Sequence, residues 1–258
     1  MNHTFPIDPF GLTYSESDIE SGVLWESHCH ALYEMIAVLE GDVSVVLEGK
    51  SYRLTPHQAI LIPPITYHIV TANKPGTYRR ATALFDISAV PEVLRECLEK
   101  KTRKPISFPS DQMDELGEIR TEEKPDFYKP LAHSLMIRMI YNTIRATPPS
   151  DLEEAHESDD FLKQIVQYVD EHLCEKIPLD TLAAHTARSK SSVCHLFEEK
   201  MGVSPKQYIL QKKMALANKL IRDGVPPTQA AMQVGYQNYS AFYRAYRRHF
   251  QVNPSKEP

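Results

Sequence analysis

Four side chains in the first third of the chain are of the types that bind a metal ion or a polar ligand. His28, His30 and Glu34 follow one another at spacings of two and four, and His68 comes later. Because alternate residues of a strand point to the same face, the first three share a face if their segment is extended. Two imidazoles and a carboxylate, completed by the His68 imidazole from a neighbouring strand, would form a divalent-metal site with open coordination positions.

The surroundings of these residues are apolar in the sequence. Leu32, Ile36 and Val38 alternate onto the same strand face, so we expect the polar residues to point into an apolar barrel interior. Trp25 and Tyr67 flank the histidines and could stack on a planar or sugar-like ligand. A lone Trp in a small barrel is also often plain core, and that alternative stays open.

A second set of candidate residues lies near the carboxyl end, on two segments with the pattern of recognition helices. In Lys190–Met201 the apolar residues Val193, Leu196 and Phe197 fall at i, i+3 and i+4 and face inward, and aromatic residues at spacings of four do the same in Tyr239–Phe250. The outward residues are mostly small, polar or basic, as on a helix that reads base edges. They are Lys190, Ser191, Cys194 and His195 in the first segment and Tyr239, Ser240, Tyr243, Arg244 and Arg247 in the second.

A connecting helix between these segments has recognisable ends. Ser204-Pro205-Lys206-Gln207 places a hydroxyl at the N-cap, proline at the first helical position and glutamine three residues on, which is a capping box. Gly224 supplies a left-handed stop. About 19 residues at about 1.5 Å each span roughly 28 Å. This length approaches the roughly 34 Å between successive turns of the major groove.

Charge is distributed unevenly along the chain, whose formal net charge is −5. From Arg188 onward there are 12 basic and 4 acidic residues, a net of +8, whereas residues 151–187 carry 2 basic and 10 acidic residues. DNA binding explains the positive charge of this helix-turn-helix region, because lysine and arginine neutralise the DNA phosphates. A helical bundle that binds protein would not explain it. We therefore predict double-stranded DNA as a partner.

Composition indicates a globular protein of ordinary type. The 258 residues suffice for two domains, and 42% hydrophobic with 24% charged residues is typical of a soluble chain. The four cysteines include no C-x-x-C pair, which favours neither a zinc cluster nor a disulfide framework and fits a reducing compartment. The sequence has no signal peptide and no apolar stretch near about 18 residues. We expect a cytoplasmic location without membrane contact.

The amino-terminal half predicts an antiparallel β-barrel or jelly roll. Residues 1–20 show little periodicity, and we expect them to form an arm over the first domain or a frayed end. Residues 21–90 have short strands separated by turns, which is typical of a barrel. The clearest strands are Met35–Leu39, Val43–Leu47, Ala59–Ile62 and Tyr78–Ile87.

Helices and a linker follow the barrel. Residues 91–147 contain three helix candidates, namely Pro91–Lys100, Asp111–Glu122 and Pro130–Ala146. The third carries Met139 on one face and Ile137 and Tyr141 on the other, so it must pack on the barrel and on something else. Residues 148–158, with two prolines and several acids, form a linker, and residues 159–258 form an all-helical domain. The predicted fold class is α+β with two domains.

The last 100 residues resemble the AraC family of transcription regulators, of the AraC/XylS type. The matching features are Leu182-Ala183, Ser189, Leu196-Phe197, Gly202-x-Ser204-Pro205-x-x-Tyr208, Ala231-x-x-Val234-Gly235-Tyr236, Phe242-x-Arg244-x-Tyr246 and Pro254-Ser255. The chain departs from the family at Ala230, at Gln251 and after Ser255. The resemblance implies that one chain reads two adjacent major grooves with the nine outward residues. It also implies a homodimer formed through helices beside the barrel, an arm that responds to ligand, and contact with RNA polymerase if the protein is an activator.

The histidine-rich segment resembles the first motif of the cupin family, as Gly22-x5-His28-x-His30-x3-Glu34-x6-Gly41. The second cupin motif is partial, because Pro63 and His68 match but His57, Ile65 and Ala72 do not. In AraC-family regulators such a strand often lines an inducer pocket without metal. Two alternatives stay open. One is a divalent metal on His28, His30, Glu34 and His68 that helps to hold the effector, and the other is a purely structural polar cluster.

The predicted function is that of a sequence-specific transcription regulator whose cupin-like domain senses a small molecule and alters DNA binding by the two helix-turn-helix units. It is not predicted to be an enzyme. The rival hypothesis is a metal-dependent cupin enzyme fused to a helical domain, and the partial second motif argues against it. A third is a regulator with a vestigial pocket that responds to no ligand. The sequence does not distinguish activation from repression and does not indicate the operator, because single side chains do not map uniquely onto bases.

Overall fold

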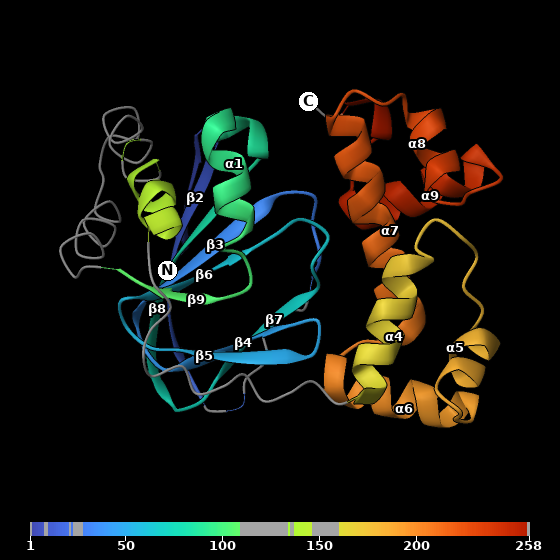
Figure 1. Ribbon diagram of the computed structural model, residues 1–258, viewed down its shortest axis with the longest axis horizontal. Helices are drawn as coiled ribbons and strands as arrows, with labels where there is room; N and C mark the ends of the chain where they lie inside the picture. The colour runs from blue at the N-terminus through green and yellow to red at the C-terminus, as the bar shows by residue number, and fades with distance from the viewer. Residues whose placement is uncertain are drawn as a thin grey trace.

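The computed structural model describes residues 2–7, 10–20, 22, 28–108, 134, 137–145 and 160–256. A β-barrel domain precedes an all-helical domain, and the two stand side by side in Figure 1. This arrangement confirms the predicted α+β class with two domains. Trp25, the helix candidate at 111–122 and the linker at 148–158 lie outside the described residues.

Two antiparallel sheets make the barrel. The larger has the strand order β1-β2-β8-β3-β6-β9, and the smaller has the order β5-β4-β7. The bounds are β1 (Asn2–Ile7), β2 (Phe10–Ile19), β3 (Tyr33–Glu40), β4 (Val43–Leu47), β5 (Lys50–Leu54), β6 (Gln58–Ile62), β7 (His68–Ala72), β8 (Gly76–Phe85) and β9 (Pro105–Ser107).

The predicted arm at residues 1–20 is wrong, because these residues are part of the larger sheet. Strand β2 pairs with β8 along its whole length, from Phe10 opposite Phe85 to Ile19 opposite Gly76, and β1 pairs with β2. The barrel domain therefore begins well before residue 21. In the sequence, Phe10, Leu12 and Tyr14 alternate with smaller or polar residues, and this short period-two pattern is the signal that could have identified β2.

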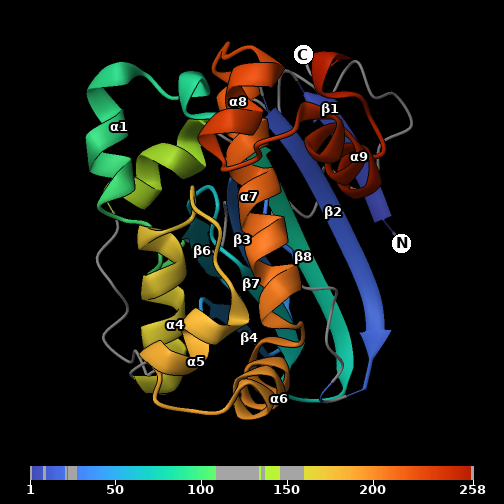
Figure 2. The ribbon, with the colours of Figure 1, turned by 90° about the vertical axis from the view of Figure 1, so that its right-hand side faces the viewer.

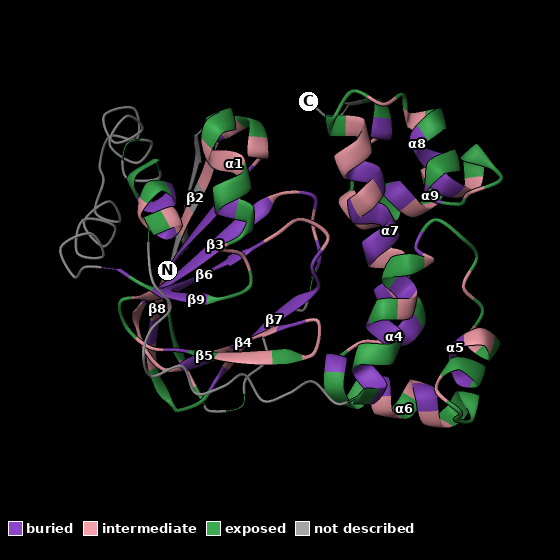
Figure 3. Ribbon diagram, in the orientation of Figure 1, coloured by how far each residue is buried: buried purple, intermediate pink, exposed green. Residues whose placement is uncertain are grey.

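Each sheet has an inner and an outer face with a different apolar cluster. The inner faces enclose the barrel core, which includes Ile36, Val38, Val45, Ile60 and Val70. The outer face of the larger sheet is covered by α1 (Glu92–Glu99) and by the helix at 137–145. In Figure 3 the strands β3 and β6 of this sheet are largely purple, which marks them as buried on both faces.

The carboxyl-terminal domain consists of six α-helices among the described residues. They are α4 (Asp160–Glu171), α5 (Leu179–His185), α6 (Lys190–Met201), α7 (Pro205–Arg222), α8 (Pro227–Gln233) and α9 (Tyr239–Phe250). The capping box predicted at Ser204 and Gln207 is present, and α7 ends at Arg222, with Asp223 as its C-cap directly before Gly224. Short 3-10 helices lie at Ile87–Ala89 (η1) and Pro254–Lys256 (η3).

The helical domain packs on the outer face of the smaller sheet. One apolar cluster combines Cys29, Tyr67 and Ile69 of the barrel with Phe197 and Tyr208 of the helices. Figure 2 shows α4 and α7 standing side by side in front of this sheet. In the part of the chain that the structure describes, none of the helices has the length and apolar character needed to cross a bilayer.

Candidate functional site

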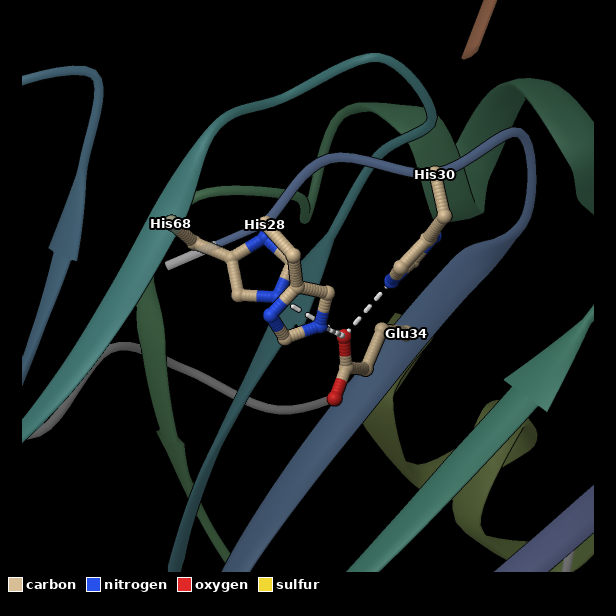
Figure 4. A group of neighbouring side chains, drawn as sticks. All are labelled: His28, His30, Glu34 and His68. Atoms are coloured by element: carbon tan, nitrogen blue, oxygen red, sulfur yellow. Dashed lines mark hydrogen bonds and ion pairs between the residues drawn. The ribbon is translucent and has the colours of Figure 1, made fainter. Parts of the chain in front are cut away.

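The three histidines and the glutamate singled out in the sequence converge at one end of the barrel. The Nε2 atoms of His30 and His68 lie 2.7 and 2.9 Å from Oε2 of Glu34, and Nε2 of His28 lies 3.8 Å from the same oxygen. One potential ligand atom from each of the four residues can be chosen so that all lie within 4.8 Å of one another. Figure 4 shows the three rings gathered around this carboxylate.

The backbone that carries these residues is only partly a strand. His28 and His68 exchange two backbone hydrogen bonds as an isolated bridge, and β3 begins only at Tyr33. The expectation that His28 and His30 lie with Glu34 on one continuous strand is therefore wrong, although their side chains meet. The Ile65 N–H donates to the His30 carbonyl, which ties the segment to the loop before His68.

Hydrogen-bond accounting shows why a cation suits this cluster. Nδ1 of His30 lies 3.0 Å from the Leu32 carbonyl, and Nδ1 of His68 lies 3.0 Å from the Thr66 carbonyl. Each Nδ1 must carry the proton to donate there, so a neutral ring presents a bare Nε2 to the Glu34 carboxylate. Nε2 of His68 also has no hydrogen-bond partner of suitable direction among the described residues. With both rings neutral, their two lone pairs converge on the buried carboxylate, and a divalent cation would satisfy all three groups.

The charge state of Glu34 agrees with this arrangement. Burial alone would raise the pKa of the Glu34 carboxyl, but the three imidazoles that face it outweigh burial and hold the pKa well below its ordinary value. The carboxylate is therefore ionised in a nearly dry setting, with 6% of its side chain exposed. Three imidazoles and one carboxylate are donors that divalent transition metals accept.

Tyr67, predicted to contact a ligand beside the histidines, faces the other way. Its hydroxyl donates to the Met201 carbonyl at 3.5 Å, and its ring centroid lies 5.2 Å from that of Tyr208. Adjacent residues of a strand point to opposite faces, so with His68 inside the barrel Tyr67 must lie outside it. The prediction of Tyr67 as a ligand contact is therefore wrong, and period-two reasoning could have shown this.

A buried ionic cluster, which sequence reasoning missed, joins the barrel to the helical domain. The ammonium of Lys212 on α7 donates to Glu48 at 2.8 Å and to Asp170 at 2.5 Å, and the Tyr208 hydroxyl also donates to Glu48. Burial would lower the pKa of Lys212, but the two carboxylates outweigh it and the pKa is raised. Glu48 lies in the β4–β5 turn, and its carboxylate also accepts the Tyr67 backbone N–H at 2.9 Å.

The four-residue site and this junction occupy opposite faces of the same two backbone segments. Cys29 lies between His28 and His30, yet it is buried in the cluster shared with the helices. Burial raises the pKa of its thiol, while the charge of Lys212 lowers it, which places Cys29 near the ionic cluster. Tyr67 and His68 divide between the two faces in the same way. A displacement of either histidine segment would therefore also move Cys29 or Tyr67 at the junction.

The predicted recognition helices have the expected inner and outer faces. We call α5 with α6 the first reading unit and α8 with α9 the second. Val193 and Phe197 are buried in the first, and Phe242 and Tyr246 in the second. Among the predicted outward residues, those with exposed side chains are Lys190, Ser191, His195, Tyr239, Ser240, Arg244 and Arg247.

Two predicted outward residues are only half exposed, and a third is paired. Cys194 lines an apolar pocket of about 440 Å³ together with Leu182 and Ile209. The hydroxyl of Tyr243 donates to Asn253 at 2.9 Å. Lys190 forms an ion pair with Asp180 at 2.5 Å. The face free to meet DNA is accordingly narrower than the sequence pattern indicates.

The positive charge of the domain is also partly internal. Lys212 is buried in the junction, and Lys213 donates to the Glu175 carbonyl at 2.7 Å and the Val234 carbonyl at 2.9 Å. Burial lowers the pKa of Lys213. Two of the lysines counted toward a phosphate-binding surface therefore hold the domain together, and the arginines of α9 carry more of the exposed charge.

Known proteins resemble both halves of the chain. Residues 13–164 match the family model for the AraC-like ligand binding domain, and residues 182–257 match that for the helix-turn-helix domain. The uncharacterized HTH-type transcriptional regulator YbfI of Bacillus subtilis is 24% identical over 83% of this chain and 80% of its own. The probable transcriptional regulator LumQ of Photobacterium leiognathi is 33% identical, but the match spans 36% of this chain and 38% of LumQ. A crystal structure of ToxT from Vibrio cholerae aligns over 96% of both chains with a TM-score of 0.42 and 12% identity.

Proposed function

The chain belongs to the AraC-like regulators, with an amino-terminal ligand-binding domain and a helix-turn-helix domain, and from this premise we propose how it senses and responds. An effector binds at the cluster of His28, His30, Glu34 and His68, and a divalent cation held by these residues helps to bind it. Occupancy changes the junction between the barrel and the first reading unit and thereby changes the affinity for DNA.

The observation that carries this proposal is the shared backbone of site and junction. The segment at 28–30 presents His28 and His30 to the cluster and Cys29 to the helical domain, and the pair Tyr67–His68 presents His68 to the cluster and Tyr67 to the helical domain. A ligand can shift an equilibrium only through different contacts in the two states. Here an occupant that draws the imidazoles together would move Cys29 and Tyr67 against Tyr208, so the two states differ at the junction.

DNA reading is assigned to the exposed side chains at the starts of α6 and α9. Ser191 and His195 in the first unit, and Tyr239 and Arg244 in the second, are the proposed base-edge contacts. Arg247 is proposed to contact phosphate, since most bonds at such interfaces go to the DNA backbone. The N-caps Ser189 and Asn238 start both helices at the positions from which these residues project.

The cation would be held by three imidazoles and one carboxylate, and when bound it would offer open coordination positions to an oxygen or nitrogen of the effector. The chain's own residues do the rest. Glu34 supplies the buried negative charge, and the Leu32 and Thr66 carbonyls orient two of the rings. The named relatives are transcriptional regulators, and we propose that this site binds its occupant without turnover.

Assembly is proposed to involve the helix at 137–145. Met139 and Ile140 are buried against the barrel, while Ile137 and Tyr141 are 39% and 47% exposed. An apolar face left open beside a packed one suits a second copy of the chain. We further propose that the homodimer acts in the cytoplasm, and that it contacts RNA polymerase where it activates.

The test combines metal binding with DNA binding by the full-length protein. After chelation, calorimetric titration with Zn²⁺ is expected to show one ion per chain, with binding at least about tenfold weaker in His68→Ala. His57→Asn, at an exposed histidine outside the cluster, is the control and should bind Zn²⁺ normally. Duplexes selected by the protein from a random pool should then bind with an affinity that depends on Zn²⁺ in the wild type and in His57→Asn, but not in His68→Ala. Selection of no duplex, or equal affinity with and without Zn²⁺ in the wild type, would refute the proposal.

A further inference from the structure

The inner face of the larger sheet carries a polar stripe in addition to the histidine cluster. In the register of β3 and β8, Glu34 lies opposite Leu84, Ile36 opposite Thr82 and Val38 opposite Arg80. Directly opposed residues of paired strands share a face, so Thr82 and Arg80 project into the same interior as Glu34. On the other side of β8, Thr13 and Ser15 of β2 lie opposite Thr82 and Arg80. The stripe thus comprises Thr13, Ser15, Arg80 and Thr82.

Two buried atoms of this stripe lack the partners that buried polar groups normally have. Nε of Arg80 and Oγ1 of Thr82 are both shielded from solvent and have no hydrogen-bond partner among the described residues. An unsatisfied buried polar atom of this kind destabilises the fold and calls for a physical explanation. In the interior of a ligand-binding domain, a bound polar molecule that accepts from Arg80 is such an explanation.

In the described part of the chain, no carboxylate pairs with the guanidinium of Arg80. Its neighbour Arg79 also has a buried Nε without a hydrogen-bond partner, but its guanidinium pairs with Glu40 at 2.6 Å. The guanidinium of Arg80 lies 5.9 Å from the ring centroid of Tyr78, which is 1% exposed. Burial raises the pKa of the Tyr78 hydroxyl, the charge of Arg80 and its side-chain hydrogen bond to Tyr78 oppose this, and Glu34 adds to it, so both charged groups act on the same interior region. A cation in this setting calls for an anion.

We propose that the effector is a small organic monocarboxylic acid whose carboxylate pairs with Arg80 and whose other polar atoms reach Thr82 and the histidine cluster. This inference rests on the proposed function, since it names the ligand class of the same sensory domain. Val38 lies four positions after Glu34 on β3, which is about 13 Å along the strand. A molecule of a few carbon atoms is long enough to bridge much of that interval between the two groups of side chains.

A carboxylate fits this stripe better than a phosphate ester. A phosphate carries up to two negative charges, and Arg80 is the single cation identified on the stripe, with the Glu34 carboxylate on the same face. A guanidinium binds a carboxylate through two parallel N–H donors, and the single negative charge of the carboxylate then cancels the single positive charge of Arg80. Thr82 and the hydroxyls of Thr13 and Ser15 suit an acid that also carries hydroxyl or carbonyl groups.

The test uses matched acids and neutral analogues with the full-length, Zn²⁺-loaded protein. The pairs are D-gluconate with D-glucitol, D-glucuronate with D-glucose, and butyrate with butyramide, and inorganic phosphate is the control anion. At least one acid is expected to bind in calorimetry and to raise the Tm, while its neutral partner and phosphate do so at least tenfold more weakly. R80Q should weaken binding of that acid about tenfold or more, because a charge-assisted pair is lost. R80K should retain part of it, and R79Q should retain all of it.

The acid-to-neutral comparison needs only the wild type, so it remains decisive even if R80Q folds poorly. Neutral analogues that bind as tightly as their acids, phosphate that binds as tightly as the acids, or a panel in which no acid binds would overturn the inference. So would an R80Q variant that keeps its fold and the full affinity. These failures are separable from failure of the proposed function, which is decided by the Zn²⁺ dependence of DNA binding with no acid present.

Discussion

The two reading units differ in what closes their hydrophobic cores. The core of the first includes Tyr67, Ile69 and Cys29 of the barrel beside Phe197 and Val193. The core of the second is formed, among the described residues, by helical-domain side chains alone, with Phe242 and Tyr246 at its centre. A change in the barrel therefore acts on the first unit directly, and it reaches the second only through the helices that the units share.

Helix α7 is the shared element. Its first half supplies Tyr208 and Lys212 to the junction, and its second half supplies Met214 and Asn218 to the second unit, where Asn218 donates to the Tyr246 hydroxyl at 2.7 Å. One rigid helix thus has one end set by the barrel and the other by the second recognition helix. Sensing and DNA reading are therefore coupled through packing of the barrel on the first unit. The following variants test this difference between the two units.

The largest expected effects come from removing the central ring of each core. Phe197→Ala and Phe242→Ala each delete a fully buried ring and should cost about 3–5 kcal/mol of folding free energy. Because the core of Phe197 is shared, its loss should increase amide hydrogen exchange in β7 as well as in α6. Loss of Phe242 should increase exchange in α8 and α9 and leave β7 unchanged. If β7 exchanges at the wild-type rate in Phe197→Ala, the first unit is not docked on the barrel.

The next effect concerns the ionic cluster of the junction. Lys212→Met leaves Glu48 without its cation and should cost about 3 kcal/mol by denaturant unfolding, since breaking a buried pair leaves an uncompensated charge. The matched control is Lys219→Met on the same helix, whose pair with Asp223 is partly exposed, at 34% and 45% of the two side chains, and should contribute under about 1 kcal/mol. Equal losses in the two variants would mean that the junction ion pair adds no more than a surface pair.

A smaller effect is expected where the second unit meets the segment after α4. Gly235 has φ +85°, and a Cβ there would collide with the Cys174 carbonyl oxygen after α4, so Gly235→Ala should cost about 2–3 kcal/mol. Gly224 has a similar φ of +90° with open space around it, so Gly224→Ala should cost only about 1 kcal/mol of strain. The difference between the two costs, measured by thermal unfolding, reports the close approach of the second unit to the segment after α4. Equal costs would show that the backbone there shifts freely.

Local patterns predicted much of this fold. The Ser204–Gln207 capping box, the inward spacing of Phe242 and Tyr246, and the convergence of His28, His30, Glu34 and His68 follow from short stretches with a defined period or motif. Such features depend on contacts within one element or on a motif with fixed spacers. The structure therefore confirms them with little change.

Long-range contacts account for what sequence reasoning missed. Lys212 and Lys213 are ordinary surface residues by type, and only contacts with residues distant in the sequence bury them: the Glu48 carboxylate of the barrel for Lys212, and the Glu175 and Val234 carbonyls for Lys213. Tyr67 was assigned to the ligand side because it adjoins His68, although strand alternation sends it to the opposite face. The sequence predicts an arm in place of the first two strands because β2 finds its partner, β8, 57 to 75 residues further along the chain, between Ile19 and Gly76 and between Phe10 and Phe85.

The central claim is that occupancy of the histidine cluster is transmitted to the first reading unit, and amide hydrogen exchange tests it most directly. The full-length protein would be compared with and without Zn²⁺, and His68→Ala would serve as the control. The account predicts changed exchange in α6 and in the first half of α7, little change in α9, and no response in His68→Ala. Exchange that changes equally in both reading units, or in neither, would contradict it.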